Sequence, residues 1–195
     1  GGSGDAFLVK FNSAGIRLWA TYYGGPATPL TWGNEYGPSI ASDAAGNIYL
    51  AGFTGSFSGI ASGGFQNSYG GSGYDAFLVK FSSAGTRLWA TYYGGTDNDE
   101  CSSVATDAAG NVYLAGDSYS PNTGNVIAFG GFQNNRVGLE NEFLAKFDAS
   151  GNRLCATYYG QQHDEDGHVA VDNSGNAYLT GSTPAASGIA SAGFQ

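Results

Sequence analysis

One sequence segment of about twenty residues occurs three times in this chain and constrains its fold more than any other feature. Residues 5–25 read DAFLVKFNSAGIRLWATYYGG, and residues 75–95 repeat this text with changes at two of 21 positions. A looser copy, NEFLAKFDASGNRLCATYYGQ, starts at Asn141. The copies are offset by 70 and then 66 residues. A period of this kind indicates stacked supersecondary units rather than one irregular domain.

Each repeat holds two segments that read as β-hairpins. In residues 5–25, apolar and other side chains alternate with the period of two of a strand, and a turn follows. A three-residue loop ending at Gly15 is favoured, because glycine adopts the left-handed conformation that this loop needs. A four-residue loop would also place Lys10 opposite Arg17. The shorter loop predicts Lys10 opposite Leu18 and Val9 opposite Trp19.

The second hairpin of each repeat contains the text D-x-x-G-N followed by a tyrosine, at residues 39–52, 103–116 and 168–181. Four short antiparallel strands per repeat, joined by glycine-rich turns, are typical of a β-propeller blade. From the axis outward we expect strand a at residues 39–42, b around Tyr49, c around Leu8 or Leu78, and d in the LWATYY segments. A solenoid of stacked hairpins is the alternative, although its repeats are usually shorter.

We therefore predict an all-β chain that carries three four-stranded blades' worth of propeller. The repeats are expected at residues 1–66, 67–133 and 134–195, as one continuous propeller unit. The chain begins with strands c and d and ends with strands a and b. Two half-blades would then expose strand edges that invite pairing. We expect either a twofold homodimer that closes six blades, or neighbouring repeats of a longer chain that supply the missing strands.

The repeated text also resembles a known family. The succession D-A-F-L-V-K-F, L-W-A-T-Y-Y-G-G, D-A-A-G-N-x-Y-L-A-G and G-G-F-Q is similar to the bacterial seven-bladed β-propeller repeat known as SBBP. The resemblance covers essentially the whole chain and implies a propeller from bacterial proteins that are mostly secreted or attached to the surface. It implies a scaffold and brings no catalytic residues. We expect an extracellular or cell-surface location, and the lack of an initiating Met suggests a processed chain or a piece of a longer one.

Charge and cysteine usage exclude several classes. The net charge is −9, and six of the seven basic residues occupy repeat-equivalent positions rather than a patch, so nucleic acid is not an expected partner. No run of 18 apolar residues could span a membrane. Cys155 stands where the other copies have Trp19 and Trp89, which suggests a small core substitute. One disulfide with Cys101 is left open.

The repeated residues are best interpreted as framework, because side chains that recur in every blade pack against the next blade. Asp43, Asp107 and Asp172 open hairpin turns, where an aspartate commonly accepts hydrogen bonds from the turn's own backbone. Function is then expected where the copies differ, in the linkers from strand d to strand a and in the loops from b to c. Both kinds of connection should open on one face of the propeller.

The linkers are acidic, and clustered carboxylates could bind Ca²⁺, which takes six to eight oxygen ligands. No segment matches an EF-hand loop, so a solvated acidic rim is the alternative. The residues that would contribute to a Ca²⁺ site are Glu35, Asp97, Asp99, Glu100, Asp164, Glu165 and Asp166.

The loops combine Gly, Ser, Asn and Tyr, a composition suited to adaptable polar and aromatic contacts. Trp32, in an insertion unique to the first linker, is the best candidate for a binding aromatic, with Tyr36 and Tyr119 beside it in our candidate ligand site. The recurring G-F-Q triplets at 64–66, 131–133 and 193–195 are interpreted as plugs that hold each loop down. The main hypothesis is a non-enzymatic scaffold or binding module whose partner is a glycan or a surface protein, and the second is carbohydrate recognition.

A hydrolase is the least favoured interpretation. The two histidines, His163 and His168, occur only in the third repeat, and no G-x-S-x-G motif is present. No glycine pattern of a nucleotide-binding fold follows a strand and opens a helix. We predict that the chain is not an enzyme.

Overall fold

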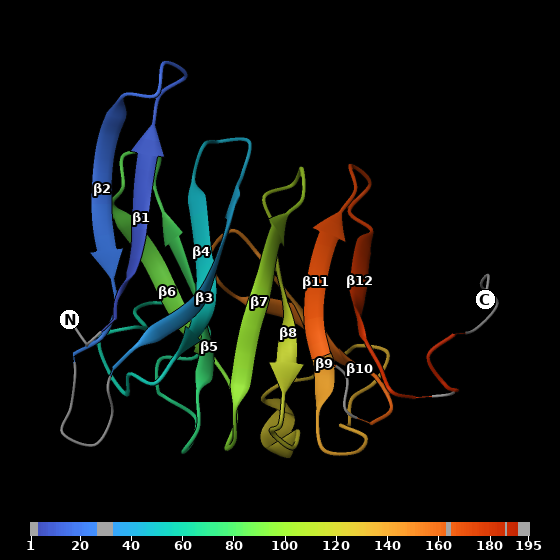
Figure 1. Cartoon of the computed structure of the whole chain (residues 1–195). Helices are drawn as coiled ribbons and strands as arrows, with labels where there is room; N and C mark the ends of the chain where they lie inside the picture. The colour runs from blue at the N-terminus through green and yellow to red at the C-terminus, as the bar shows by residue number, and fades with distance from the viewer. Residues whose placement is uncertain (1–3, 27–32, 163–164, 186, 191–195) are drawn as a thin grey trace.

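The computed structural model describes residues 4–26, 33–162, 165–185 and 187–190, and shows twelve strands in four antiparallel sheets (Figure 1). Two sheets have four strands each, in the orders β3-β4-β5-β6 and β7-β8-β9-β10, and two have two strands each, β1-β2 and β11-β12. The strands are β1 (Ala6–Phe11), β2 (Arg17–Tyr23), β3 (Glu35–Ser42), β4 (Ile48–Thr54), β5 (Asp75–Phe81), β6 (Arg87–Tyr93), β7 (Asp99–Thr106), β8 (Val112–Ser118), β9 (Asn141–Phe147), β10 (Arg153–Tyr159), β11 (Glu165–Val171) and β12 (Ala177–Ser182). One short 3-10 turn, η1, covers Thr123–Asn125.

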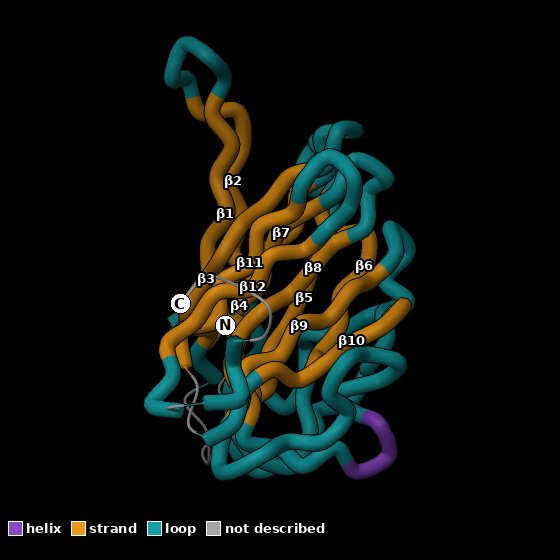
Figure 2. Tube along the Cα trace, turned by 90° about the vertical axis from the view of Figure 1, so that its right-hand side faces the viewer, coloured by secondary structure: helices purple, strands orange, loops and turns teal. Residues whose placement is uncertain are grey.

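This arrangement confirms the predicted all-β propeller architecture, with two complete blades flanked by two halves. The a strands β3, β7 and β11 lie side by side (Figure 1). Serine hydroxyls join them: Ser39 Oγ accepts from the Val104 amide at 3.2 Å, and Ser103 Oγ accepts from Val169 at 3.1 Å. The four sheets do not close into a ring, and the β1-β2 hairpin projects beyond its neighbours (Figure 2).

The first hairpin has the predicted loop but a different register. The Gly15 amide donates to the Asn12 carbonyl at 3.0 Å, and Gly15 adopts a φ of 77°, as the three-residue loop requires. Beyond the loop, however, Lys10 pairs with Trp19 instead of Leu18, and Val9 pairs with Ala20 instead of Trp19. The prediction of these pairs was wrong because a β-bulge follows the turn and inserts one extra residue.

The bulge places a lysine and a tryptophan next to each other, where both reach the following blade. Lys80 Nζ and Trp89 Nε1 donate to the Ala149 carbonyl at 2.9 and 3.1 Å. The Trp89 ring lies on Gly151, where a Cβ atom would come within 2.9 Å of it. Lys10 and Trp19 donate in the same way to Ser83. The repeated Lys and Trp are therefore blade-to-blade framework, as predicted.

The turn aspartates also have the predicted role. Asp43 Oδ1 accepts from the backbone amides of Ala45 and Asn47 at 3.0 and 2.9 Å, and Oδ2 accepts from Asn47 Nδ2. The corresponding bonds recur at Asp107 and Asp172. These carboxylates fix the turns of the a–b hairpins, because they replace backbone partners that a tight turn cannot supply.

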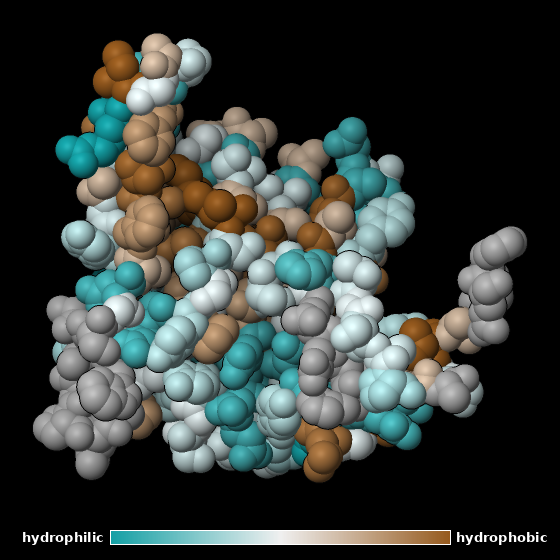
Figure 3. All heavy atoms as spheres, in the orientation of Figure 1, coloured by the Kyte–Doolittle hydropathy of each residue, from teal (hydrophilic) through white to brown (hydrophobic). Residues whose placement is uncertain are grey.

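The core lies between successive blades. Tyr23 of β2 packs on Phe77 of β5 with ring centroids 5.4 Å apart, and Tyr93 of β6 packs on Phe143 of β9 at 5.2 Å. Hydrophobic side chains remain exposed where the arc of blades ends, and Figure 3 shows them gathered over the end that carries β1 and β2. Each blade thus buries its neighbour's face, and no blade among the described residues covers the two terminal faces.

Both cysteines are free thiols, so the disulfide that the sequence left open is not formed. Cys101 is buried in the core between the two complete blades, and Cys155 is half-buried in β10. Within the described ranges, no helix has the length and apolar character needed to cross a membrane.

Candidate functional site

The connections that differ between repeats lie on one face, as predicted. The Gly55 amide donates to the Asn34 carbonyl at 3.2 Å, and the Tyr119 amide donates to Asn98 at 2.9 Å, so each b–c loop contacts a d–a linker. We call this surface, with the adjoining strand ends, the variable face; its described parts are residues 24–26, 33–36, 53–74, 94–100, 117–140 and 160–162. It lies at the lower side of Figure 1, opposite the hairpin turns.

The long b–c loops are held against the outer strands. The Ser62 amide donates to Ala90 at 2.8 Å, and the Tyr92 amide donates to Gln66 at 2.9 Å, so the loop covers the free edge of β6. The Gln66 amide also donates to Thr91 Oγ1 at 2.7 Å. The second loop repeats these bonds along β10. The first two G-F-Q triplets therefore hold their loops down, as predicted, and the third lies outside the described residues.

Two of the acidic linker residues point into the protein. Glu35 Oε1 accepts from the hydroxyls of Thr54 and Ser56 at 2.8 and 2.9 Å. Asp99 accepts from the hydroxyls of Ser118 and Ser120 in the same arrangement. Burial raises the pKa of Glu35 and raises that of Asp99 to about 6. These two carboxyls tie each linker to a b–c loop.

A third buried acid lies beside them at the start of β5. Asp75 is 1% exposed, and its Oδ2 accepts from the Gly70 amide at 2.6 Å. Burial, with a smaller contribution from the charge of Asp99, raises the pKa of Asp75 to about 7. The third repeat has Asn141 at this position, whose Oδ1 accepts from the Val137 amide at 2.7 Å. The site therefore needs an acceptor oxygen rather than a charge.

An aromatic cluster joins the variable face to strands β3 and β4. Tyr36, a predicted site residue, stacks on Phe53 with centroids 5.4 Å apart, and Tyr74 contacts both rings edge-on at 5.6 Å. Tyr36 is 37% exposed. Phe53 and Tyr74 were missed by the sequence analysis. The sequence marks these positions in one way: the next repeat has acids at the positions of all three aromatic residues.

Those acids form the matching cluster of the next blade. Glu100 pairs with Asp117 between β7 and β8, and Glu140 precedes β9 at the position of Tyr74. Burial raises the pKa of Glu100, and the charge of Glu140 adds to the rise. An aromatic cluster on one blade thus has an acidic cluster on the next. Aromatic rings stack on apolar faces and carboxylates accept from hydroxyl or ammonium donors.

The remaining predicted site residues are not brought together by the described structure. Asp97 is exposed in its linker, and Tyr119 is half-buried in the second b–c loop. Trp32, Asp164 and the side chains of Glu165 and Asp166 lie outside the described residues. In the part of the chain that is described, no three His, Cys, Asp or Glu side chains are arranged to hold a metal ion.

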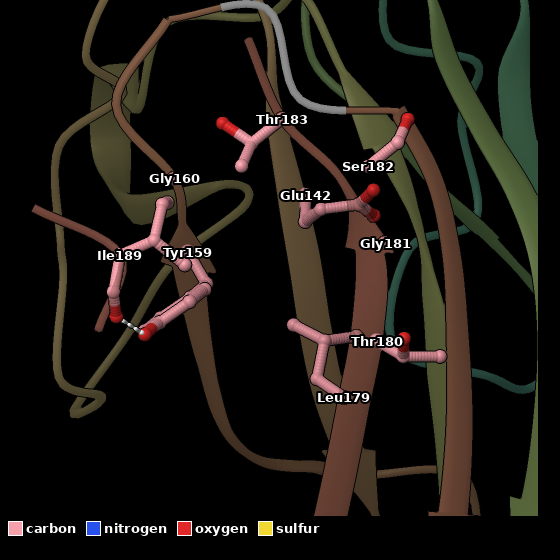
Figure 4. Close-up of a pocket in the computed structure, with 9 residues that line it drawn as sticks. All are labelled: Glu142, Tyr159, Gly160, Leu179, Thr180, Gly181, Ser182, Thr183 and Ile189. Atoms are coloured by element: carbon pink, nitrogen blue, oxygen red, sulfur yellow. Dashed lines mark hydrogen bonds between the residues drawn. The ribbon is translucent and has the colours of Figure 1, made fainter. Parts of the chain in front are cut away.

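A hollow opens between the last complete blade, at β9 and β10, and strand β12 of the half-blade (Figure 4). It is lined by Glu142, Tyr159, Gly160, Leu179, Thr180, Gly181, Ser182, Thr183 and Ile189. Tyr159 OH donates to the Ile189 carbonyl at its rim. Glu142 is the one carboxyl among these lining residues, whereas glycoside hydrolysis uses a facing pair.

Comparisons with known proteins agree with the propeller architecture. Residues 88–122 and 156–185 match the family model described as a β-propeller repeat, SBBP. The chain is 31% identical over 126 residues to the regulatory protein FlaEY of Caulobacter vibrioides, which covers 64% of this chain and 13% of that protein. It is 26% identical over 205 residues to the uncharacterized WD repeat-containing protein L264 of Acanthamoeba polyphaga mimivirus, covering 91% of this chain and 14% of that protein. The chain thus spans 13–14% of the length of these relatives.

Proposed function

Because the chain carries β-propeller repeats of the SBBP family, we propose that it is a non-enzymatic binding or scaffold module that contacts its partner through the variable face. One observation carries this proposal. The c-strand lysine makes the same contacts with the turn aspartate and the b-strand tyrosine in both complete blades, whereas the positions of Tyr36, Phe53 and Tyr74 change to acids in the next blade. Variation concentrated on one face of a constant frame is typical of a recognition surface.

The relatives support a role of this general kind. One is described as a WD repeat-containing protein and the other as a regulatory protein, and neither description names a reaction. Fold alone does not determine function, so the proposed role rests on the residues of the variable face. We place the module outside the cell or on the surface of a bacterium, supported by the resemblance to secreted propellers.

Carbohydrate is the ligand class that the aromatic cluster favours. Tyr36 and Phe53 form a stacked pair of the kind on which the apolar face of a sugar ring can lie. The Tyr74 hydroxyl and the neighbouring Glu100 supply acceptors for sugar hydroxyls. This second proposal depends on the first, because it assigns a ligand to the same face.

The open ends of the arc imply further strands from another source. We propose that a second copy of this chain supplies them in a twofold dimer of six blades, and that neighbouring repeats of a longer chain are the alternative.

A glycan array with three proteins tests the binding role. We expect that Tyr36→Ala weakens any glycan binding by at least about tenfold, since the stacked ring is lost. Leu88→Ala is the matched control, because Leu88 is 52% exposed near the hairpin turns, on the opposite side of the blade. Screens with esterase, glycosidase and peptidase substrates should stay at background. Robust turnover that a single change such as Glu142→Gln abolishes would contradict the non-enzymatic role.

A further inference from the structure

At the interface between the two complete blades, a phenylalanine from one blade packs against side chains of the next. Phe65, from the G-F-Q triplet of the first b–c loop, lies 6.4 Å from the Tyr93 ring of its own blade. On its other side it contacts the next blade, with the Phe147 ring at 6.3 Å and the Arg153 guanidinium over its face at 4.4 Å. In the contact between the two complete blades, an aromatic side chain is therefore held between an arginine and rings of both blades.

The last complete blade presents the same side chain with no blade to receive it. Phe132 occupies the position of Phe65 and lies 6.2 Å from Tyr159, the equivalent of Tyr93. It is 85% exposed, whereas Phe65 is 39% exposed. A hollow on this side is lined by Leu144, Lys146 and Cys155. Their equivalents in the first complete blade, Leu78, Lys80 and Trp89, face the next blade.

The other end of the arc presents the surface that Phe132 lacks. On the uncovered side of the β1-β2 hairpin, Phe7, Phe11 and Tyr22 are 68%, 55% and 78% exposed. The equivalent Phe77, Phe81 and Tyr92 in the first complete blade are 0%, 3% and 1% exposed. Phe11 and Arg17 stand at the positions of Phe147 and Arg153. This side of the hairpin thus carries the aromatic residues that a complete blade buries against the blade before it.

Charged groups at the two ends match in the same way. In each complete blade, a c-strand lysine pairs with the turn aspartate and lies over the b-strand tyrosine. The first complete blade uses Lys80, Asp43 and Tyr49, and the second uses Lys146, Asp107 and Tyr113. The half-blade β11-β12 has Asp172 bonded to Tyr178, and the half-blade β1-β2 has Lys10. Within the described residues, neither Lys10 nor Asp172 belongs to an ion pair.

We propose that a second copy of this chain completes the half-blade β11-β12 with its β1-β2 hairpin. In this seam, β1 of the second copy pairs with β12 as β5 pairs with β4, and its Lys10 meets Asp172 and Tyr178. Phe132 enters between Phe11 and Arg17 of the second copy. This inference rests on the proposed closure of the propeller, and adds the residues that recognise the second copy. Twofold symmetry produces two identical seams, so each substitution acts twice.

The test compares the native mass and the dimer dissociation constant of the full chain with those of three variants, by light scattering and analytical ultracentrifugation. Phe132→Ala should weaken the dimer by at least about tenfold per seam while leaving the melting temperature of the monomer unchanged, since Phe132 is exposed there. Asp172→Asn should also weaken the dimer, and should preserve the turn, because Asn12 makes the equivalent backbone bonds in its own turn. Leu154→Ala is the control: its equivalent Leu88 stays 52% exposed beside a complete interface.

We expect about twice the chain mass for the wild type and for Leu154→Ala. A monomer at all concentrations, or a dimer that Phe132→Ala and Asp172→Asn both leave intact, overturns the seam. Failure of the seam is distinguishable from failure of the proposed binding role. A monomer that still binds a ligand through Tyr36 refutes only the seam, and a dimer of the predicted kind that lacks any partner refutes only the binding role.

Discussion

The buried carboxyl of Asp75 makes the stability of the chain depend on pH in a predictable direction. Burial raises the pKa of Asp75 from 3.8 to about 7, so the folded chain holds this proton more tightly than the unfolded chain. The resulting stabilisation is fully present below about pH 4 and is lost as the pH rises through 7. Since one pKa unit corresponds to about 1.4 kcal/mol, the loss between pH 5 and pH 8 is on the order of 2–3 kcal/mol.

Asp75→Asn should remove this loss. Asparagine keeps an acceptor oxygen for the Gly70 amide, as Asn141 does for Val137 in the third repeat, but it has no charge to bury. Urea denaturation followed by tryptophan fluorescence, at pH 5 and at pH 8, would give the free energy of unfolding of both proteins. We expect the variant to be the more stable protein at pH 8, by on the order of 2–3 kcal/mol more than at pH 5.

The matched control is Asp97→Asn, which removes the same charge from an exposed position of the linker. It should leave the difference in unfolding free energy between pH 5 and pH 8 within about 0.5 kcal/mol of the wild-type value. If the wild type and Asp75→Asn lost the same free energy of unfolding between pH 5 and pH 8, the reasoning would be refuted, because the pH dependence would then arise from other groups.

Three further results are expected. Trp89→Ala should lower the free energy of unfolding by about 3–5 kcal/mol in urea titrations, because the ring is 7% exposed on the next blade, whereas Leu88→Ala should cost less than about 1 kcal/mol. Burial raises the pKa of Cys101 to about 12, so a thiol reagent should modify Cys101 only after unfolding and Cys155 before it; equal rates in the native chain would contradict this. The melting temperature should be the same in millimolar Ca²⁺ and in excess chelator, because the inward-pointing linker carboxyls already accept from hydroxyls; a rise in Ca²⁺ would show that the outer linker acids bind the ion.

The strand order and the framework roles could be predicted from the sequence because they repeat. The near-identical sequences of residues 5–25 and 75–95 are expected to form the same hairpin, and Gly15 marks its turn. The register beyond the turn could not be derived in this way. The bulge that pairs Lys10 with Trp19 is determined by how both side chains reach the Ser83 carbonyl of the next blade, and this contact spans more than 60 residues.

The candidate site was harder to predict because its partners are distant in sequence. Glu35 and Asp99 look like solvated linker acids, yet hydroxyls from the end of strand b satisfy them inside the protein. The recurrence of Thr54-x-Ser56 as Ser118-x-Ser120 was an available signal. The aromatic cluster around Tyr36 is assembled from β3, β4 and the approach to β5, so only the folded sheet shows it.

Imaging of the purified chain by electron microscopy tests the central claim most directly. If this arc of two blades and two halves closes with a second copy, class averages should show a closed ring of six blades, twice the number that one chain supplies. A folded, stable particle of one chain mass, with the half-blades β1-β2 and β11-β12 left open, would contradict the account.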